Sequence, residues 1–282
     1  MRRHHLAALA AFIGSLLLTL TVALPAQAAK PPSGGGTTYP SSMASLGDSI
    51  TRGFNASGWY TDAPDRSWST GTYASVKSHY TRLLTKNKRM KAYNDARTGA
   101  KMAELPNQAA SAVSQGAQYV TVLMGANDAC TSTEATMTSV DSFRASFSSA
   151  MSTLAGAATP PKVLVATIPD VYRLYQVGKD SSSARNAWST FGICQSMLAN
   201  PTSTDATDEA RRQRVRQRVV DYNSALVEVC ASYTFCKDDR GAVFGYPFTL
   251  SQLSTWDYFH PNTAGQAVLA EQTWRAGFWP TV

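Results

Sequence analysis

Short apolar runs alternate along the chain with longer segments in which apolar residues recur every three or four positions. The short runs are typical of buried strands and lie at residues 43–46, 91–93, 119–124 and 163–168. The longer segments are typical of amphipathic helices and lie at residues 101–114, 139–154, 208–233 and 263–274. This alternation predicts repeated βα units, and therefore an α/β fold whose parallel sheet is covered on both faces.

The beginning of the chain differs from the rest. Arg2 and Arg3 precede an apolar run at residues 6–24, which leads to the small-residue site Ala26-Gln27-Ala28. A membrane anchor is the alternative, but the site favours cleavage near Ala28 and a secreted protein. We therefore predict a signal peptide at 1–28, a flexible Pro/Gly linker at 29–38, and a single domain at 39–282.

The charge of the chain is a weak argument about partners. After removal of Arg2 and Arg3, 24 basic residues face 19 acidic ones, a net charge of +5. Such an excess is compatible with transient contact with a lipid surface. Five arginines lie between Arg211 and Arg218, but apolar residues recur helically through the same region. They are typical of the solvated face of a helix, so we expect no nucleic-acid binding.

The chain has four cysteines, all of which lie after the predicted cleavage site. An even number in an exported protein predicts two disulfides, for which three pairings are possible. We favour Cys230–Cys236, which closes a short loop, and Cys130–Cys194, which ties two loops together. The chain has no Cys-x-x-Cys or His-x-x-x-His spacing, so we expect no metal and no cofactor.

A serine follows the first predicted strand in Gly47-Asp48-Ser49. Gly47 has the backbone freedom to make a turn that projects Ser49 above the sheet edge, where the amides of a following helix favour developing negative charge. The tripeptide is also an ordinary turn sequence. The Gly-x-Ser-x-Gly elbow is absent because Thr51 occupies the second glycine position, which argues against the common lipase fold with that motif.

Two further loops follow predicted strands and carry hydrogen-bond donors. Asn127, in Gly125-Ala126-Asn127-Asp128, has a side-chain amide suited to stabilise an oxyanion, although an Asn-Asp pair also supplies turn and cap hydrogen bonds. Gly99 brings its N–H close to a substrate if the loop allows, and is otherwise a simple loop glycine.

Histidine chemistry is restricted to two positions in the mature chain, His79 and His260. His79 has no nearby carboxylate in the sequence, so we interpret it as a helix-surface or packing residue. His260 lies three residues after Asp257, just before the last predicted helix. In one turn this spacing allows the carboxylate to hold Nδ1 while Nε2 faces a serine, although a capped loop has the same pattern.

Together these four segments resemble the SGNH/GDSL family of lipases and esterases, in order and in position across nearly the whole mature chain. The resemblance implies a three-layer αβα sandwich with a central parallel sheet, similar to flavodoxin. It implies that Ser49 is the nucleophile, with Asp257 and His260 as the orienting acid and the base. The backbone of Ser49, Gly99 and Asn127 match the oxyanion donors. Residue 50 is isoleucine where the family usually has leucine.

Within this family, residues 125–130, 171–200 and 257–261 look most similar to the phospholipase B-like branch. We therefore expect a secreted serine esterase that acts on lipid or phospholipid acyl esters and works as a monomer. The alternatives are a short-chain or carbohydrate (acetyl) esterase, and a non-catalytic cell-wall or polysaccharide binding module. Transfer of the acyl group to an alcohol in place of water also stays open.

The region between residues 171 and 200 is predicted as a long loop rich in apolar residues. Its aromatic side chains are candidates for substrate binding in an acyl groove, and equally for a satellite core under the loop. If they are buried, short acyl groups are favoured over lipids. The candidates are Tyr172, Tyr175, Trp188 and Phe191.

Overall fold

The computed structural model describes residues 38–279. The signal peptide and nearly all of the linker predicted from the sequence lie outside the described residues. The parallel sheet has the order β2-β1-β3-β4-β5, with every neighbouring pair parallel. The strands are β1 Ser42–Gly47, β2 Lys91–Asn94, β3 Tyr119–Leu123, β4 Lys162–Val165 and β5 Cys236–Asp238.

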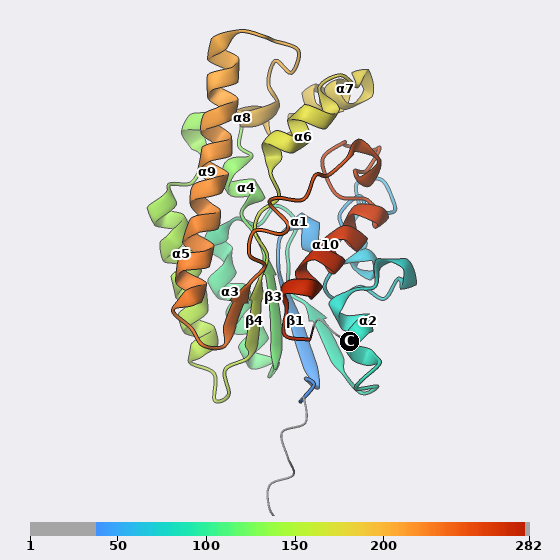
Figure 1. Cartoon of the computed structure of the whole chain (residues 1–282), viewed down its shortest axis with the longest axis vertical. Coiled ribbons are helices and arrows are strands. Elements are labelled where there is room, and N and C mark those ends of the chain that lie inside the picture. The colour runs from blue at the N-terminus through green and yellow to red at the C-terminus, as the bar shows by residue number, and fades with distance from the viewer. Residues whose placement is uncertain (1–37, 280–282) are drawn as a thin grey trace, which may run out of the picture. The chain divides into compact units, whose positions relative to one another are not determined.

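Helices cover both faces of this sheet and continue beyond the carboxyl ends of its strands (Figure 1). They are α1 Ser49–Arg52, α2 His79–Leu84, α3 Leu105–Ser114, α4 Ala126–Ala129, α5 Val140–Ala155, α6 Val171–Gly178, α7 Ser182–Thr190, α8 Gln195–Leu198, α9 Ala206–Ala231 and α10 Thr263–Ala276. Short 3₁₀ turns lie at Pro64–Arg66, Ala74–Val76, Met102–Glu104, Glu134–Thr136 and Leu250–Gln252. The α/β fold with a five-stranded parallel sheet is therefore as predicted.

The two faces of the sheet pack against different sets of helices. Ala44 and Leu46 of β1 belong to the larger core, together with apolar residues of α3, α5 and α9. Met43 points the other way, into a smaller core that contains Leu83 of α2 and Trp274 of α10. Because side chains alternate along a strand, this division makes three layers, with α3, α5 and α9 on one side and α2 and α10 on the other (Figure 1).

The main departure from the predicted elements lies between residues 171 and 200. This segment is helical and not a long loop, because α6, α7 and α8 occupy most of it. Asp170 and Ser181 cap the first two helices by accepting hydrogen bonds from Tyr172 N–H and Ala184 N–H. Among the aromatic residues of this segment, Phe191 is exposed and lies at the end of α7.

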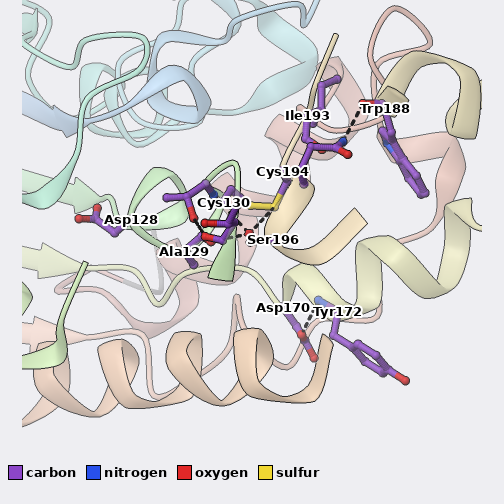
Figure 2. Close-up of a disulfide and its surroundings, with 12 residues drawn as sticks. Asp128, Ala129, Cys130, Asp170, Tyr172, Trp188, Ile193, Cys194 and Ser196 are labelled. Atoms are coloured by element: carbon purple, nitrogen blue, oxygen red, sulfur yellow. Dashed lines mark hydrogen bonds between the residues drawn. A yellow bond between two sulfur atoms is a disulfide. The ribbon is translucent and has the colours of Figure 1, made fainter. Parts of the chain in front are cut away.

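Both predicted disulfides are present. Cys230–Cys236 joins the end of α9 to β5, and Cys130–Cys194 joins the end of α4 to the start of α8. Figure 2 shows that Ser196 lies beside the second bridge and donates a hydrogen bond of 2.7 Å to the carbonyl of Ala129. The bridge thus holds α4 against the α6–α8 segment.

Two disulfides are compatible with an extracellular compartment, where such bonds persist. Among the helices within residues 38–279, none combines the length and the apolar character needed to cross a bilayer.

Candidate active site

The loops after three neighbouring strands meet at one edge of the sheet. Gly47 at the end of β1 is in register with Leu123 of β3, and Ser45 with Asn94 of β2. Ser49 follows β1 directly, while Gly99 and Asn127 lie in the loops after β2 and β3. Parallel strands that end in register bring these three residues to the same edge, as expected for a ligand site in such a sheet.

The turn that carries Ser49 depends on a glycine at position 47. Gly47 has φ +155°, and a Cβ there would lie 2.4 Å from the carbonyl oxygen of Leu123, so a side chain would collide. Gln108 of α3 fixes this glycine twice, accepting from its N–H at 2.7 Å and donating to its carbonyl at 2.9 Å. Gln108 was not predicted, because its partner lies 61 residues away in sequence.

Ser49, His260 and Asp257 form a continuous hydrogen-bonded relay. His260 Nε2 lies 2.8 Å from Ser49 Oγ, and His260 Nδ1 lies 2.6 Å from Asp257 Oδ2. Because an ionised carboxylate only accepts, Nδ1 carries a proton and Nε2 is left to take the proton of the serine hydroxyl. This geometry activates a hydroxyl as a nucleophile.

Asp257 is buried and accepts from four donors. Its Oδ1 accepts from the N–H groups of Phe259 and His260, and its Oδ2 accepts from His260 Nδ1 and Asn55 Nδ2. Burial by itself would raise the pKa of Asp257, but the hydrogen bond and charge of His260, with the other donors, hold it below the usual range. The carboxylate is therefore ionised at neutral pH.

Asn55 is a site residue that the sequence analysis missed. Its Nδ2 lies 2.6 Å from the Asp257 oxygen that also accepts from His260. The side chain is buried, and the backbone has φ +57°, a left-handed conformation that asparagine adopts more readily than most residues. The one sequence signal was an asparagine near Gly58, which is typical of any turn.

Two groups predicted to donate hydrogen bonds to an oxyanion lie in the loops after β2 and β3. The side chain of Asn127 donates to the carbonyl of Ala100 at 3.0 Å, which holds its amide against the residue that follows Gly99. Gly99 is exposed, has φ +82°, and has open space where a Cβ would be. An amide nitrogen has two hydrogens, so the second hydrogen of Asn127 can serve a substrate.

Two neighbouring aspartates are buried and have perturbed acidity. Burial raises the pKa of Asp48 to about 7, although Ile50 N–H donates to its Oδ1 and the charge of His260 opposes the shift. Burial also raises the pKa of Asp128, against hydrogen bonds from Met102 N–H and the Thr138 hydroxyl. Asp128 thus ties the loop after β2 to the loop after β3.

An apolar pocket with about 50 Å³ of free space opens beside Ser49. Its wall includes the residues next to Ser49, Asn127 and His260 in sequence, so it adjoins the relay. The lining residues are Ile50, Ala126, Pro169, Asp170, Val171, Leu174, Val177, Phe248, Leu253, Phe259 and Pro261.

The four aromatic residues proposed for substrate binding have different environments. Tyr175 and Trp188 are buried and belong to the larger core. Trp188 Nε1 donates to the carbonyl of Tyr258 at 3.0 Å, so it supports the loop that carries His260. The hydroxyl of Tyr172 donates to Glu209 at 2.7 Å, and Phe191 is half exposed. None of the four lines the pocket beside Ser49.

His79 takes no part in this relay and is fully buried. Its two ring nitrogens lie 2.8 Å from the hydroxyls of Tyr119 and Thr273, which makes it a packing residue, one of the two roles predicted for it. Among the described residues, no three His, Cys, Asp or Glu side chains are grouped so as to hold a metal ion.

Comparisons with known proteins identify the family of the chain. A family model described as GDSL-like Lipase/Acylhydrolase matches residues 43–273. None of the curated proteins matches the chain.

Several solved structures share the fold. LAE5, an alpha/beta hydrolase enzyme from the metagenome of Lake Arreo, is 18% identical with a TM-score of 0.50, over 84% of this chain and 94% of that one. A mutant of Axe2, an acetylxylan esterase from Geobacillus stearothermophilus, is 15% identical with a TM-score of 0.52, over 84% and 93%. A putative GDSL-like lipase from Parabacteroides merdae is 14% identical with a TM-score of 0.51, over 83% and 94%.

Proposed function

Since the chain belongs to the GDSL-like lipase/acylhydrolase family, and is thus a carboxylic ester hydrolase, we propose that it cleaves esters of short acyl groups through an acyl-enzyme on Ser49. The observation that carries the acyl-group assignment is the size of the apolar pocket beside that serine. Its 50 Å³ of free space, against 10–15 Å³ for one water molecule, makes it a small pocket, which favours a short acyl group.

The mechanism is acyl transfer in two steps. His260 Nε2 takes the proton of Ser49 as Oγ attacks the ester carbonyl, and Asp257 stabilises the imidazolium that forms. The Ser49 and Gly99 N–H groups and the Asn127 amide stabilise the oxyanion. Collapse breaks the ester bond, and His260 returns the proton to the leaving alcohol. Water, activated by the same histidine, then releases the acid from Ser49.

Two further features support a short acyl group. Tyr175 and Trp188, which would have extended an acyl groove, are packed in the core and leave no long channel of their own. Axe2, one of the proteins that share the fold, is an acetylxylan esterase.

A second candidate keeps this mechanism but uses lipid or phospholipid acyl esters. It is supported by the similarity of residues 125–130 and 257–261 to the phospholipase B-like branch, and by the purely apolar side chains that make up most of the pocket wall. A net charge of +5 in the chain after residue 28 favours contact with an anionic lipid surface.

Hydrolysis of nitrophenyl esters with acyl chains of two to sixteen carbons separates the two candidates. We expect kcat/KM to be highest for two to four carbons and to fall at least tenfold by eight, with Ser49→Ala as the blank. Leu174→Ala, which widens the pocket, shifts the optimum to longer chains, and Val227→Ala, outside the pocket, leaves it unchanged. A maximum at twelve or more carbons, or turnover of phosphatidylcholine above that of short esters, contradicts the proposal.

A binding module needs no nucleophile, so the Ser49→Ala variant also tests that alternative. Loss of all ester turnover in this variant excludes a pure binding role.

We further propose that the protein is secreted, in keeping with its two disulfides. The mass of the protein from culture medium is then that of a chain beginning after Ala28, and retention of residues 1–28 would contradict secretion by cleavage.

A further inference from the structure

Exposed aromatic side chains gather near the relay. Trp59, Tyr60, Phe191 and Trp256 make up four of the six large hydrophobic side chains that are exposed in the described chain. The ring of Trp59 lies 5.3 Å from Phe191, 5.5 Å from Trp256 and 6.0 Å from Tyr60. We call these four residues the aromatic platform. It brings together a loop after α1, the end of α7 and the loop that carries Asp257.

The aromatic platform is continuous with the catalytic relay. Phe54 lies between them, with its ring 5.5 Å from Tyr60 and 5.0 Å from His260. Trp256 directly precedes Asp257 in sequence. A molecule that rests on the platform is therefore next to the imidazole.

Proximity to His260 identifies the part of the substrate that the platform faces. In the proposed mechanism His260 donates a proton to the leaving alcohol, so the alcohol lies on the His260 side of Ser49. The proposed mechanism places the acyl group in the apolar pocket, and none of the four platform residues lines that pocket. The platform is thus placed to hold the alcohol part of the ester.

The chemistry of the platform favours a sugar ring over a lipid. Its exposed side chains are all aromatic, and no leucine, isoleucine or methionine is among the exposed large hydrophobic residues of the described chain. Surfaces that enter a bilayer commonly combine aromatic rings with leucine. A pyranose presents a face of C–H groups that stacks on an aromatic ring, and equatorial hydroxyls that need hydrogen-bonding partners.

Such partners lie at the margin of the platform. Asp62, two residues after Tyr60, accepts from Arg52 Nε at 2.9 Å and from the Thr98 hydroxyl at 2.5 Å, and is partly exposed. Thr98 is the neighbour of Gly99, so this polar cluster connects the platform to the proposed oxyanion site. A carboxylate has further acceptor capacity for sugar hydroxyls.

The backbone conformation of Tyr60 also supports a binding role for the platform. Its φ of +48° is uncommon for a bulky residue, and its side chain is 76% exposed. Strain of this kind persists at sites where a particular side-chain position is needed, and burial of Tyr60 does not explain it.

We propose that the aromatic platform binds a pyranose residue of an acylated glycan, whose ester oxygen is the leaving group at Ser49. This inference rests on the proposed ester hydrolysis and names the alcohol side of its substrate. The proposed occupant is a carbohydrate. The experiment also detects the two other possible occupants, a lipid surface and a second copy of the chain.

The test compares Trp59→Ala and Phe191→Ala with Tyr73→Ala, an exposed aromatic outside the platform. The substrates are nitrophenyl acetate and a panel of partially O-acetylated tetrasaccharides of xylose, glucose, mannose and N-acetylglucosamine. We expect the platform variants to lower the ratio of kcat/KM for the best tetrasaccharide to that for nitrophenyl acetate about tenfold, mainly through KM. Tyr73→Ala leaves this ratio unchanged.

A binding measurement keeps the platform separate from catalysis. Ser49→Ala is titrated with the unacetylated tetrasaccharides in a calorimeter, and the titration is repeated with the double variant Ser49→Ala, Trp59→Ala. If the wild type hydrolyses no ester, the proposed function fails, but a saturable signal that Trp59→Ala abolishes still supports the platform. The inference is overturned if neither hydrolysis nor binding of any tetrasaccharide is weakened by Trp59→Ala or Phe191→Ala. It is also overturned if these variants instead lose binding to phosphatidylcholine vesicles, or if sedimentation shows a wild-type dimer that becomes a monomer in them.

Discussion

Asn55 and His260 donate to the same oxygen of Asp257, so the Asn55 side chain influences the relay through this carboxylate. With both donors in place, Asp257 Oδ2 is held at 2.6 Å from each. The Asn55 amide therefore fixes the orientation of the carboxylate as well as favouring its charge. Asn55 acts through Asp257 and is a positioning residue.

Asn55→Gly removes this donor and keeps a residue that tolerates φ +57°. A hydrogen bond to a charged group contributes about 1.5–3 kcal/mol, so we expect kcat to fall roughly 10–100-fold with little change in KM. Asn200→Gly, at another asparagine with positive φ but away from the site, is the control. A rise in KM as large as the fall in kcat would argue for a purely structural role.

Asn127 has a different predicted signature, because we expect its amide to donate to the oxyanion only in the transition state. Asn127→Ala should lower kcat by about 10²–10³, the usual cost of one oxyanion donor, and leave KM nearly constant. Ser49→Ala should lower turnover by about 10⁶. Steady-state kinetics on nitrophenyl acetate measures both, and an Asn127→Ala enzyme with wild-type kcat would remove this side chain from the oxyanion site.

At the scale of elements, the Cys130–Cys194 bridge connects the α6–α8 segment to the helix that carries Asn127. The bridge spans 64 residues and Cys230–Cys236 spans 6, so the loop-closure model assigns them about 4 and about 2 kcal/mol. We predict that replacing both cysteines of the longer bridge by alanine lowers the free energy of unfolding by the larger amount and also lowers kcat. Denaturant unfolding and ester kinetics measure these effects.

The shorter bridge provides the matched control for that prediction. Cys230 and Cys236 lie at the end of α9 and in β5, away from Ser49. Their replacement by alanine should lower stability by about 2 kcal/mol and leave kcat unchanged. Equal losses of kcat in the two double variants would show that the effect comes from general destabilisation and not from α4.

The sequence was informative about elements where one local pattern was sufficient. Four strands were predicted because each is a short run of mostly apolar residues. The strand Cys236–Asp238 was not predicted, because it has only three residues and two of them are charged. The helix Val171–Gly178 was missed although Val171, Leu174 and Tyr175 follow a helical period, because the apolar residues of the whole 171–200 region were interpreted as a loop lining.

The same distinction applies to the site. Ser49, Asp257 and His260 each lie in a recognisable short motif, so their approach was predictable from the order of the motifs. Asn55 and Gln108 have no such motif, because their partners lie 202 and 61 positions away. Hydrogen bonds of this range depend on how the elements pack, which no local pattern contains.

For the whole molecule, α10 links the relay to the smaller core. At its start, Gln266 donates to the carbonyl of Ile50 at 2.7 Å, next to the nucleophile. At its end, Trp274 packs with its ring 5.1 Å from that of His79. Thr273 donates its hydroxyl hydrogen to the carbonyl of Leu269 at 2.6 Å, so its oxygen accepts from His79 Nε2. His79 Nδ1 then accepts from the Tyr119 hydroxyl, and the neutral ring is fully satisfied.

This arrangement makes the stability of the whole domain depend on pH. Burial, aided by the charge of Arg82, lowers the pKa of His79 to about 3, while in the unfolded chain it is about 6.5. Below pH 6.5 the unfolded state therefore binds a proton that the folded state refuses. Stability contributed by the neutral ring is complete above pH 6.5 and is lost as the pH falls towards 3, by about 2 kcal/mol at pH 5.

Comparison of the wild type with His79→Gln isolates this effect, since Asp48 acts in the opposite direction in both proteins. The pKa of Asp48 is raised to about 7, so its contribution is present at low pH and lost as the pH rises through 7. We expect the change in unfolding free energy between pH 7.5 and 5.0 to be about 2 kcal/mol less unfavourable in His79→Gln, measured by urea denaturation. The imidazole NMR signals of His79 in the folded wild type should not shift between these pH values. Equal pH dependence of the two proteins, or a titrating His79 signal, would mean that the buried ring accepts a proton and does not govern acid stability.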